Sequence, residues 1–206
     1  MNSVIGNRDQ SKQPCGPGRP MCPELHCAVL EATNRLLETQ AVGDLTINGI
    51  AKEAGVSRPA IYRRWSNVRE IALEAFLTST EQQIPMARTS SAAEMLRAQI
   101  RAIAKFMRGS GGRIVAELVG EGQKDPEVLA EFRDRFLTQR RLAGRAVIEK
   151  GIESGEFDAS IDVEIAVDLY AGPIYYRLMT GHGKLTDAFA CELAARVLRA
   201  LAPQST

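Results

Sequence analysis

Apolar residues recur every three or four positions along most of the chain, and this spacing is the strongest constraint on its fold. From residue 23 onward, most of the apolar segments start at a residue typical of helix N-termini and stop at glycine or before proline. We count nine such segments, no convincing strand and no internal repeat. Aromatic residues make up only 5% of the chain, and Ala, Leu, Glu and Arg are abundant, which also favours helix. The sequence therefore predicts an all-α fold.

The character of the segments changes along the chain and predicts three parts. Residues 1–22 contain the stretch QPCGPGRP, which is too rich in Gly and Pro for regular structure, so we expect a flexible arm there. The next segments are short and polar-faced, and we expect residues 23–68 to form a three-helix module. The later segments are longer and more apolar, and we expect residues 69–206 to form a larger helical domain.

Charge is balanced overall but not locally. The formal net charge of +1 argues against a general polyanion binder. Residues 54–69, however, contain four arginines and no carboxylate, so one patch of the surface is expected to be basic.

The four cysteines, Cys15, Cys22, Cys27 and Cys191, do not predict a metal site, because they lack the close Cys-x-x-Cys pairing that zinc sites usually show. The polar start of the chain does not resemble a signal peptide. We therefore expect reduced cysteines and a cytoplasmic protein.

Two of the short segments meet at Gly55-Val56-Ser57. Thr46 is a plausible N-cap for the first, residues 47–54, and Gly55 suits the left-handed conformation that ends many helices. Ser57 is expected to cap the second, which ends near Trp65. Two short helices joined by a three- or four-residue turn with glycine are typical of a helix-turn-helix, although a plain helical corner has the same outline.

The two faces of the second helix favour DNA binding. At 100° per residue, Ile61 and Trp65 fall together on the side expected to be buried. Pro59 and Arg63 fall opposite them. An outward arginine can read guanine, small apolar groups can touch a thymine methyl, and hydroxyls and helix N-termini suit phosphate oxygens. The predicted DNA contacts are Thr46, Ser57, Arg58, Pro59, Ala60, Tyr62, Arg63, Arg64 and Arg69, with Arg19 of the arm in the minor groove.

These residues resemble a known family. Residues 45–76, LTINGIAKEAGVSRPAIYRRWSNVREIALEAF, are similar to the helix-turn-helix of tetracycline-repressor (TetR) regulators. GEGQKDPEVLAEFRDRF and YAGPIYYRLMTGH are similar to the C-terminal domain of one branch of that family. The resemblance implies a homodimer that places residues 46–69 on DNA. It also implies a phosphate-binding lysine where this chain has Val68, so Arg69 is the expected substitute.

The larger domain is expected to hold the dimer interface and an effector pocket. Residues 163–179 are apolar on nearly every face and must be buried by something, and residues 189–201 carry an apolar stripe. We expect these last two helices to form the dimer interface, although they could instead only close the monomer core. Candidate pocket residues, each on its own better explained as core or surface, are Phe106, Met107, Glu117, Glu121, Phe136, Arg140, Tyr170 and Tyr175, with Arg133 and Tyr176 as further candidates.

The sequence thus predicts a repressor that binds a palindromic operator as a homodimer and is released by a small, largely apolar effector. Its alternatives are a dimeric interaction protein that has lost DNA binding, which Val68 favours, and a helical enzyme. Only two histidines, His26 and His182, are present, and neither has a nearby nucleophile or metal cluster, so no catalytic residue, cofactor or metal is expected. Charged residues and Gly172-Pro173 interrupt residues 163–179, so no membrane span is expected.

Overall fold

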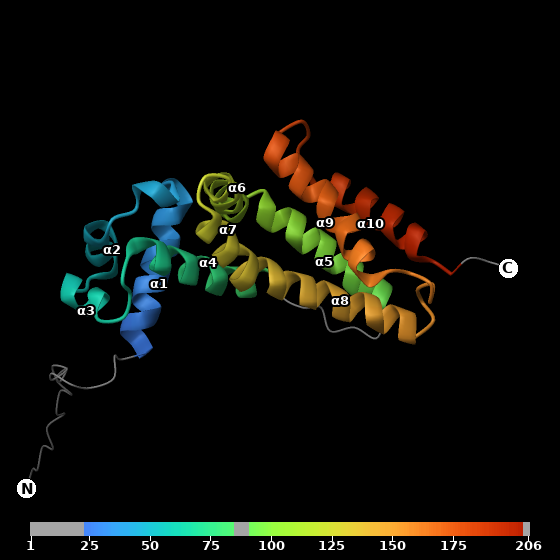
Figure 1. Cartoon of the computed structure of the whole chain (residues 1–206), viewed down its shortest axis with the longest axis horizontal. Coiled ribbons are helices and arrows are strands. Elements are labelled where there is room, and N and C mark those ends of the chain that lie inside the picture. The colour runs from blue at the N-terminus through green and yellow to red at the C-terminus, as the bar shows by residue number, and fades with distance from the viewer. Residues whose placement is uncertain (1–22, 85–90, 204–206) are drawn as a thin grey trace, which may run out of the picture.

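The computed structural model of the chain describes residues 23–84 and 91–203, and helices are the only regular structure in these ranges (Figure 1). The α-helices are α1 (Pro23–Thr39), α2 (Ile47–Ala54), α3 (Arg58–Tyr62), α4 (Val68–Gln83), α5 (Ala92–Met107), α6 (Ser110–Gly122), α7 (Pro126–Phe132), α8 (Thr138–Glu153), α9 (Val163–Thr180) and α10 (Asp187–Leu201). A 3₁₀ turn, Val42–Asp44, precedes α2, and a π-helical turn, η2 (Arg133–Leu137), joins α7 to α8. Since α7, η2 and α8 form one continuous helix, the described ranges hold nine helices, and the predicted all-α fold is confirmed.

Side-chain caps fix where most of these helices begin. In each, an oxygen of the residue before the helix accepts a hydrogen bond from a backbone amide of the first turn. These residues are Thr46, which the sequence analysis predicts as a cap, and Asn67, Ser91, Asp125, Asp162 and Thr186. Ser57 differs, because it stands before α3 in extended conformation but its side chain makes no capping hydrogen bond.

A carboxylate from a distant part of the chain also binds the start of α5. The carboxylate of Glu156 accepts hydrogen bonds from the Ser91 hydroxyl at 2.7 Å and from the amides of Ala92 and Ala93 at 2.8 and 3.1 Å. These bonds, that of Ser91 first, lower the pKa of Glu156 to about 2. The loop after α8 is thereby tied to the N-terminus of α5.

The helices pack around two hydrophobic cores that share α4. In the smaller core, α1, α2 and α3 surround Ile50, Ile61 and Trp65, and α4 contributes Ile71 and Ala75. Other α4 side chains, such as Phe76, pack in the larger core with α5 to α10. The predicted domain boundary after residue 68 therefore falls at the first turn of a helix that belongs to both cores.

The glycine-rich segment Gly109–Gly112 joins α5 to α6 and continues into α6. Only Gly109 precedes α6, and Ser110 to Gly112 form its first turn. A Cβ atom at Gly111 would lie 2.2 Å from Cζ of Phe106, and one at Gly112 would lie 2.0 Å from the carbonyl oxygen of Met107. The glycines are needed because α5 and α6 approach each other too closely for any side chain.

Figure 1 shows how these elements divide the molecule into two ends. Helices α1, α2 and α3 gather at one end, while α4, α5 and α8 run along the body. Helices α9 and α10 lie side by side on one flank of the other end, and α10 also packs along α5. None of the described helices meets the length and hydropathy needed to cross a membrane.

Candidate nucleic-acid interface and effector cavity

The turn between α2 and α3 has the geometry that the sequence predicts. Gly55 adopts a left-handed φ of 67°. Its amide donates to the carbonyl of Lys52, and the Val56 amide donates to that of Ala51 at 3.0 Å. This pattern closes the C-terminus of α2 and sends the chain directly into α3.

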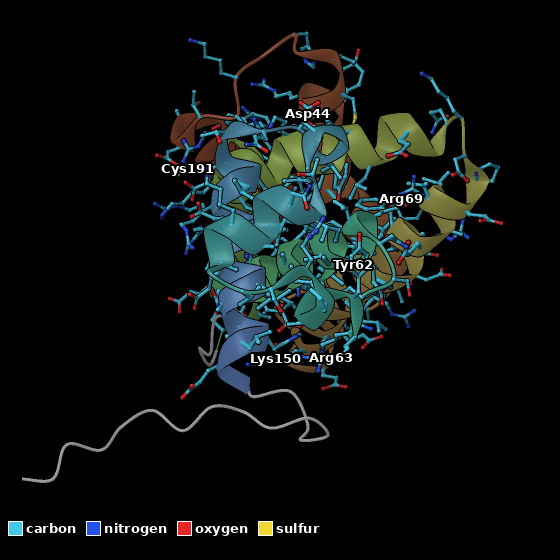
Figure 2. All side chains as sticks on the ribbon, turned by 90° about the vertical axis from the view of Figure 1, so that its left-hand side faces the viewer. Asp44, Tyr62, Arg63, Arg69, Lys150 and Cys191 are labelled. Atoms are coloured by element: carbon cyan, nitrogen blue, oxygen red, sulfur yellow. The ribbon has the colours of Figure 1, made fainter. Side chains whose placement is uncertain are left out.

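Helix α3 is buried on one side and exposed on the other. Ile61 and Trp65 are fully buried, as predicted, whereas Pro59 and Arg63 are exposed and the Tyr62 side chain is 58% exposed. Figure 2 looks at this end of the molecule, and Tyr62 and Arg63 lie on the face toward the viewer. Within the described ranges neither side chain forms a hydrogen bond or ion pair with another residue.

The predicted outward position of Ala60 is wrong. Its side chain is only 5% exposed. Trp65 lies beyond Tyr62, the last residue of α3, so it does not mark a side of the helix. The buried side of α3 is therefore centred between Ala60 and Ile61.

Two residues that the sequence analysis missed hold Trp65 in place. The indole Nε1 donates to Oε2 of Glu74 at 2.6 Å, and the other carboxylate oxygen of Glu74 lies 3.2 Å from Nε2 of His26. The His26 ring stacks on Trp65 with centroids 5.3 Å apart. Helices α1 and α4 thus hold Trp65 just beyond α3, and no helical spacing predicts this, because Glu74 is nine residues from Trp65 and His26 lies on the first helix.

The other residues predicted to contact DNA differ in what their side chains contact within the protein. Thr46 is exposed at the start of α2, where its Oγ1 caps Gly49. Arg58 is exposed but its guanidinium donates to Oδ1 of Asn48 on α2 at 3.3 Å. The guanidinium of Arg64 lies 5.8 Å from the centre of the Trp65 ring. Arg19 lies outside the described residues, as do Cys15 and Cys22, while Cys27 and Cys191 are free thiols.

Arg69, the expected substitute for the family lysine, has two acidic partners. Its Nη2 lies 2.6 Å from Oε1 of Glu121, and its Nη1 lies 3.7 Å from Oδ2 of Asp125. Val68 is half-buried against both cores. In this arrangement the Arg69 side chain joins the start of α4 to the end of α6.

Two further contacts join α6 to the N-terminal end of the molecule. The amide of Val42 donates to Oε2 of Glu117 at 2.8 Å. The guanidinium of Arg113 donates to the carbonyl of Leu37, the last buried residue of α1. Glu117 and Glu121, both predicted as pocket residues, therefore lie at this junction.

A mostly apolar cavity lies where the end of α4, α5, η2, α8 and α9 meet. The space between its lining atoms, which includes some open solvent, is about 440 Å³. Five of the predicted pocket residues line it: Met107, Phe136, Arg140, Tyr170 and Tyr175. Phe106, Arg133 and Tyr176 do not; Phe106 packs against Phe76, and the other two are exposed. The cavity has further lining residues that were not predicted from the sequence: Ile84, Ile103, Leu137, Arg141, Val167 and Ala171.

Comparison with known proteins agrees with this architecture. Residues 29–75 match the family of bacterial regulatory proteins of the tetR type, and residues 86–197 match the tetracycline-repressor-like C-terminal domain. The uncharacterized HTH-type transcriptional regulator YdeS of Bacillus subtilis (strain 168) is 32% identical over 88% of this chain and 92% of its own. The HTH-type transcriptional regulator AqdR of Rhodococcus erythropolis is 29% identical over 71% of this chain and 70% of its own.

A solved structure shows the same fold along most of the chain. The TetR family transcription regulator SCO0332 superposes with a TM-score of 0.75 at 30% identity, covering 87% of this chain and 100% of that one. The two family matches together cover the helix-turn-helix and most residues of both cores. The protein is thus a DNA-binding transcriptional regulator rather than an enzyme, and it belongs to the TetR family.

Proposed function

We propose that the protein is a repressor that binds an inverted-repeat operator as a homodimer and leaves the DNA when a small molecule occupies its cavity. The observation that carries this proposal is the exposed face of α3, where Tyr62 and Arg63 project without a protein partner in the described ranges. A guanidinium in this position can bind guanine with two hydrogen bonds, and a phenol suits a phosphate oxygen. The lack of carboxylates in residues 54–69 keeps this face attractive to DNA.

A stripe of exposed apolar side chains on α9 supports the homodimer. Ile165, Leu169, Tyr176 and Met179 are between 41% and 65% exposed, and their spacing places them along one side of the helix. Monomeric proteins rarely leave such a stripe in water. Two copies joined through α9 and α10 about a two-fold axis would present two copies of α3 to two half-sites.

Release by an effector is supported by the course of α4. This helix begins next to the recognition module, and Ile84, which ends it, lines the cavity. The Arg69–Glu121 pair ties its first turn to α6. A ligand that binds one arrangement of α4 more tightly than another would shift the equilibrium toward that arrangement, by as much as the two affinities differ. The position of α3 would change with it.

The proposal is tested on the DNA upstream of the protein's own reading frame. We expect a footprint over an inverted repeat and an affinity that falls steeply as salt rises. Arg63→Ala should weaken binding by about 1–3 kcal/mol and relax the preference for one base pair in each half-site. Arg101→Ala, an exposed arginine on α5, is the matched control and should change neither. Equal affinities of the wild type and Arg63→Ala would contradict the proposed reading face, and a folded dimer without any footprint would favour an interaction protein.

A further inference from the structure

The cavity holds one charged side chain that the protein leaves without a counter-charge. Arg140 lines it from α8, opposite the apolar side chains of Ile103 and Val167. A guanidinium in such surroundings costs free energy unless an anion or several acceptors accompany it. The partners of Arg140 therefore indicate what a ligand would have to supply.

The neighbouring arginines of α8 are paired and Arg140 is not. Arg141 contacts Glu164 and Asp168 on α9, and Arg145 lies 2.7 Å from Oε1 of Glu164. Arg140 forms no ion pair with any described residue, and its one hydrogen bond, to the carbonyl of Ile84, is long at 3.5 Å.

No carboxylate of the described residues lies close enough to form an ion pair with Arg140. Glu81 acts on Arg140 only through space, without a contact within the 4.0 Å of an ion pair. Residues 85–90, which follow Ile84, contain no Asp or Glu. Burial lowers the pKa of Arg140 from 12.5, but an arginine stays charged at neutral pH.

Two tyrosines supply further donors beside the guanidinium. Tyr170 and Tyr175 line the same cavity and lie within electrostatic range of Arg140. Burial raises the pKa of each phenol to about 12, so both hydroxyls keep their protons at neutral pH and can donate. The side chains that line the cavity thus include the unpaired Arg140, the ion-paired Arg141 and two neutral tyrosines, and no described carboxylate lines it.

We propose that the effector is an organic monoanion, a carboxylate on an apolar body, whose head group pairs with Arg140 and accepts from the Tyr175 hydroxyl. The apolar body would lie against Ile103, Met107 and Phe136. This inference rests on the proposed function, in which the bound molecule acts as the effector, but binding itself can be tested on the protein alone. A neutral ligand of the same shape would leave the guanidinium unpaired and should bind more weakly.

The test is calorimetric titration of the full chain, without DNA, at neutral pH. The probes are hexanoate, octanoate and 2-naphthoate, each beside its primary amide, which keeps the shape and removes the charge. At least one carboxylate should bind at least tenfold more tightly than its amide. Arg140→Gln should abolish that preference, and Tyr175→Phe should weaken the carboxylate several-fold and its amide less. Arg133→Gln, an exposed arginine of η2 outside the cavity, should retain the preference.

Three results would overturn the proposal. They are equal binding of a carboxylate and its amide to the wild type, a preference that survives Arg140→Gln, and no binding of any probe at millimolar concentration. Thermal melting shows whether each variant folds, and Tyr175→Phe provides the test if Arg140→Gln does not. A missing footprint in the operator experiment would overturn the repressor while these titrations stand, and a failed titration leaves the footprint unaffected.

Discussion

Replacing Leu169 by glutamate should separate the proposed dimer, and the structure gives the size of the effect. Leu169 lies in the middle of the exposed stripe on α9 and is 42% exposed. Since full burial of a leucine contributes about 1.5–3 kcal/mol, burying this remainder contributes about 1 kcal/mol per protomer. The glutamate removes that contribution twice and places two carboxylates near the two-fold axis, each with a desolvation cost on the order of several kcal/mol.

The sum is on the order of 8 kcal/mol, which corresponds to roughly a millionfold rise in the dissociation constant of the dimer. Sedimentation velocity over a concentration series measures this constant directly. We expect the wild type to sediment as a dimer and Leu169→Glu as a monomer with an unchanged thermal melting profile. The variant should also bind a palindromic operator much more weakly, because one half-site alone retains its contacts.

Leu142→Glu is the matched control, since Leu142 is 51% exposed on α8, away from the stripe. The same change of side chain there should leave the dimer intact. If Leu169→Glu remains a dimer with the wild-type dissociation constant, the assignment of the interface to α9 is wrong. If Leu142→Glu separates the protomers instead, the interface lies on α8.

Three other substitutions test separate parts of the structure. The folded-state pKa of Glu156, about 2, is below its ordinary value of 4.5, so the stability it contributes is present above about pH 4.5 and is lost as pH falls toward 2. Melting curves across this range should therefore fall more steeply for the wild type than for Glu156→Gln, and parallel curves would contradict the anion at the start of α5. Gly112→Ala should cost about 1–3 kcal/mol in denaturant unfolding because its Cβ would lie 2.0 Å from a backbone oxygen of α5, whereas Gly120→Ala, with nothing within 4 Å, should not destabilise. Glu121→Gln should change stability by no more than about 1 kcal/mol, since its pair with Arg69 is half exposed. If the released Arg69 of each protomer then binds a phosphate, the slope of log affinity against log salt steepens by about 1.8 for the dimer; an unchanged slope shows that Arg69 does not contact DNA.

The sequence predicts best those features that adjacent residues determine. Thr46 and Asn67 cap their helices and Gly55 takes the left-handed conformation because each depends on atoms no more than four residues away. The burial of Ile61 followed from spacing within α3. Local hydrogen bonding and the helical repeat are sufficient for these positions.

Features that depend on distant residues were missed or misplaced. Glu117 and Glu121 have the polar character of pocket residues, but their partners Val42 and Arg69 lie more than fifty positions away and place them at the junction with the N-terminal module. Ala60 was misplaced because the predicted buried side of α3 was centred on Ile61 and Trp65, and Trp65 lies beyond the end of the helix, where it bonds to Glu74. Tertiary contacts of this kind leave no periodic signal in the sequence.

The π-helical turn η2 shows how such a hidden feature shapes the cavity. Both the amide and the hydroxyl of Thr138 bond to the carbonyl of Arg133, five residues earlier, which widens the helix by one residue at this point. The wide turn carries Phe136 on its buried side, and Arg140 follows four residues later on the same side. An ordinary α-helix from α7 through α8 would rotate Arg140 by about 100° relative to α7, because the inserted residue would be missing. The π-helical turn therefore places the apolar Phe136 and the unpaired Arg140 on the same side of the helix, where both line the cavity. The proposed ligand, an anion with an apolar body, depends on this placement.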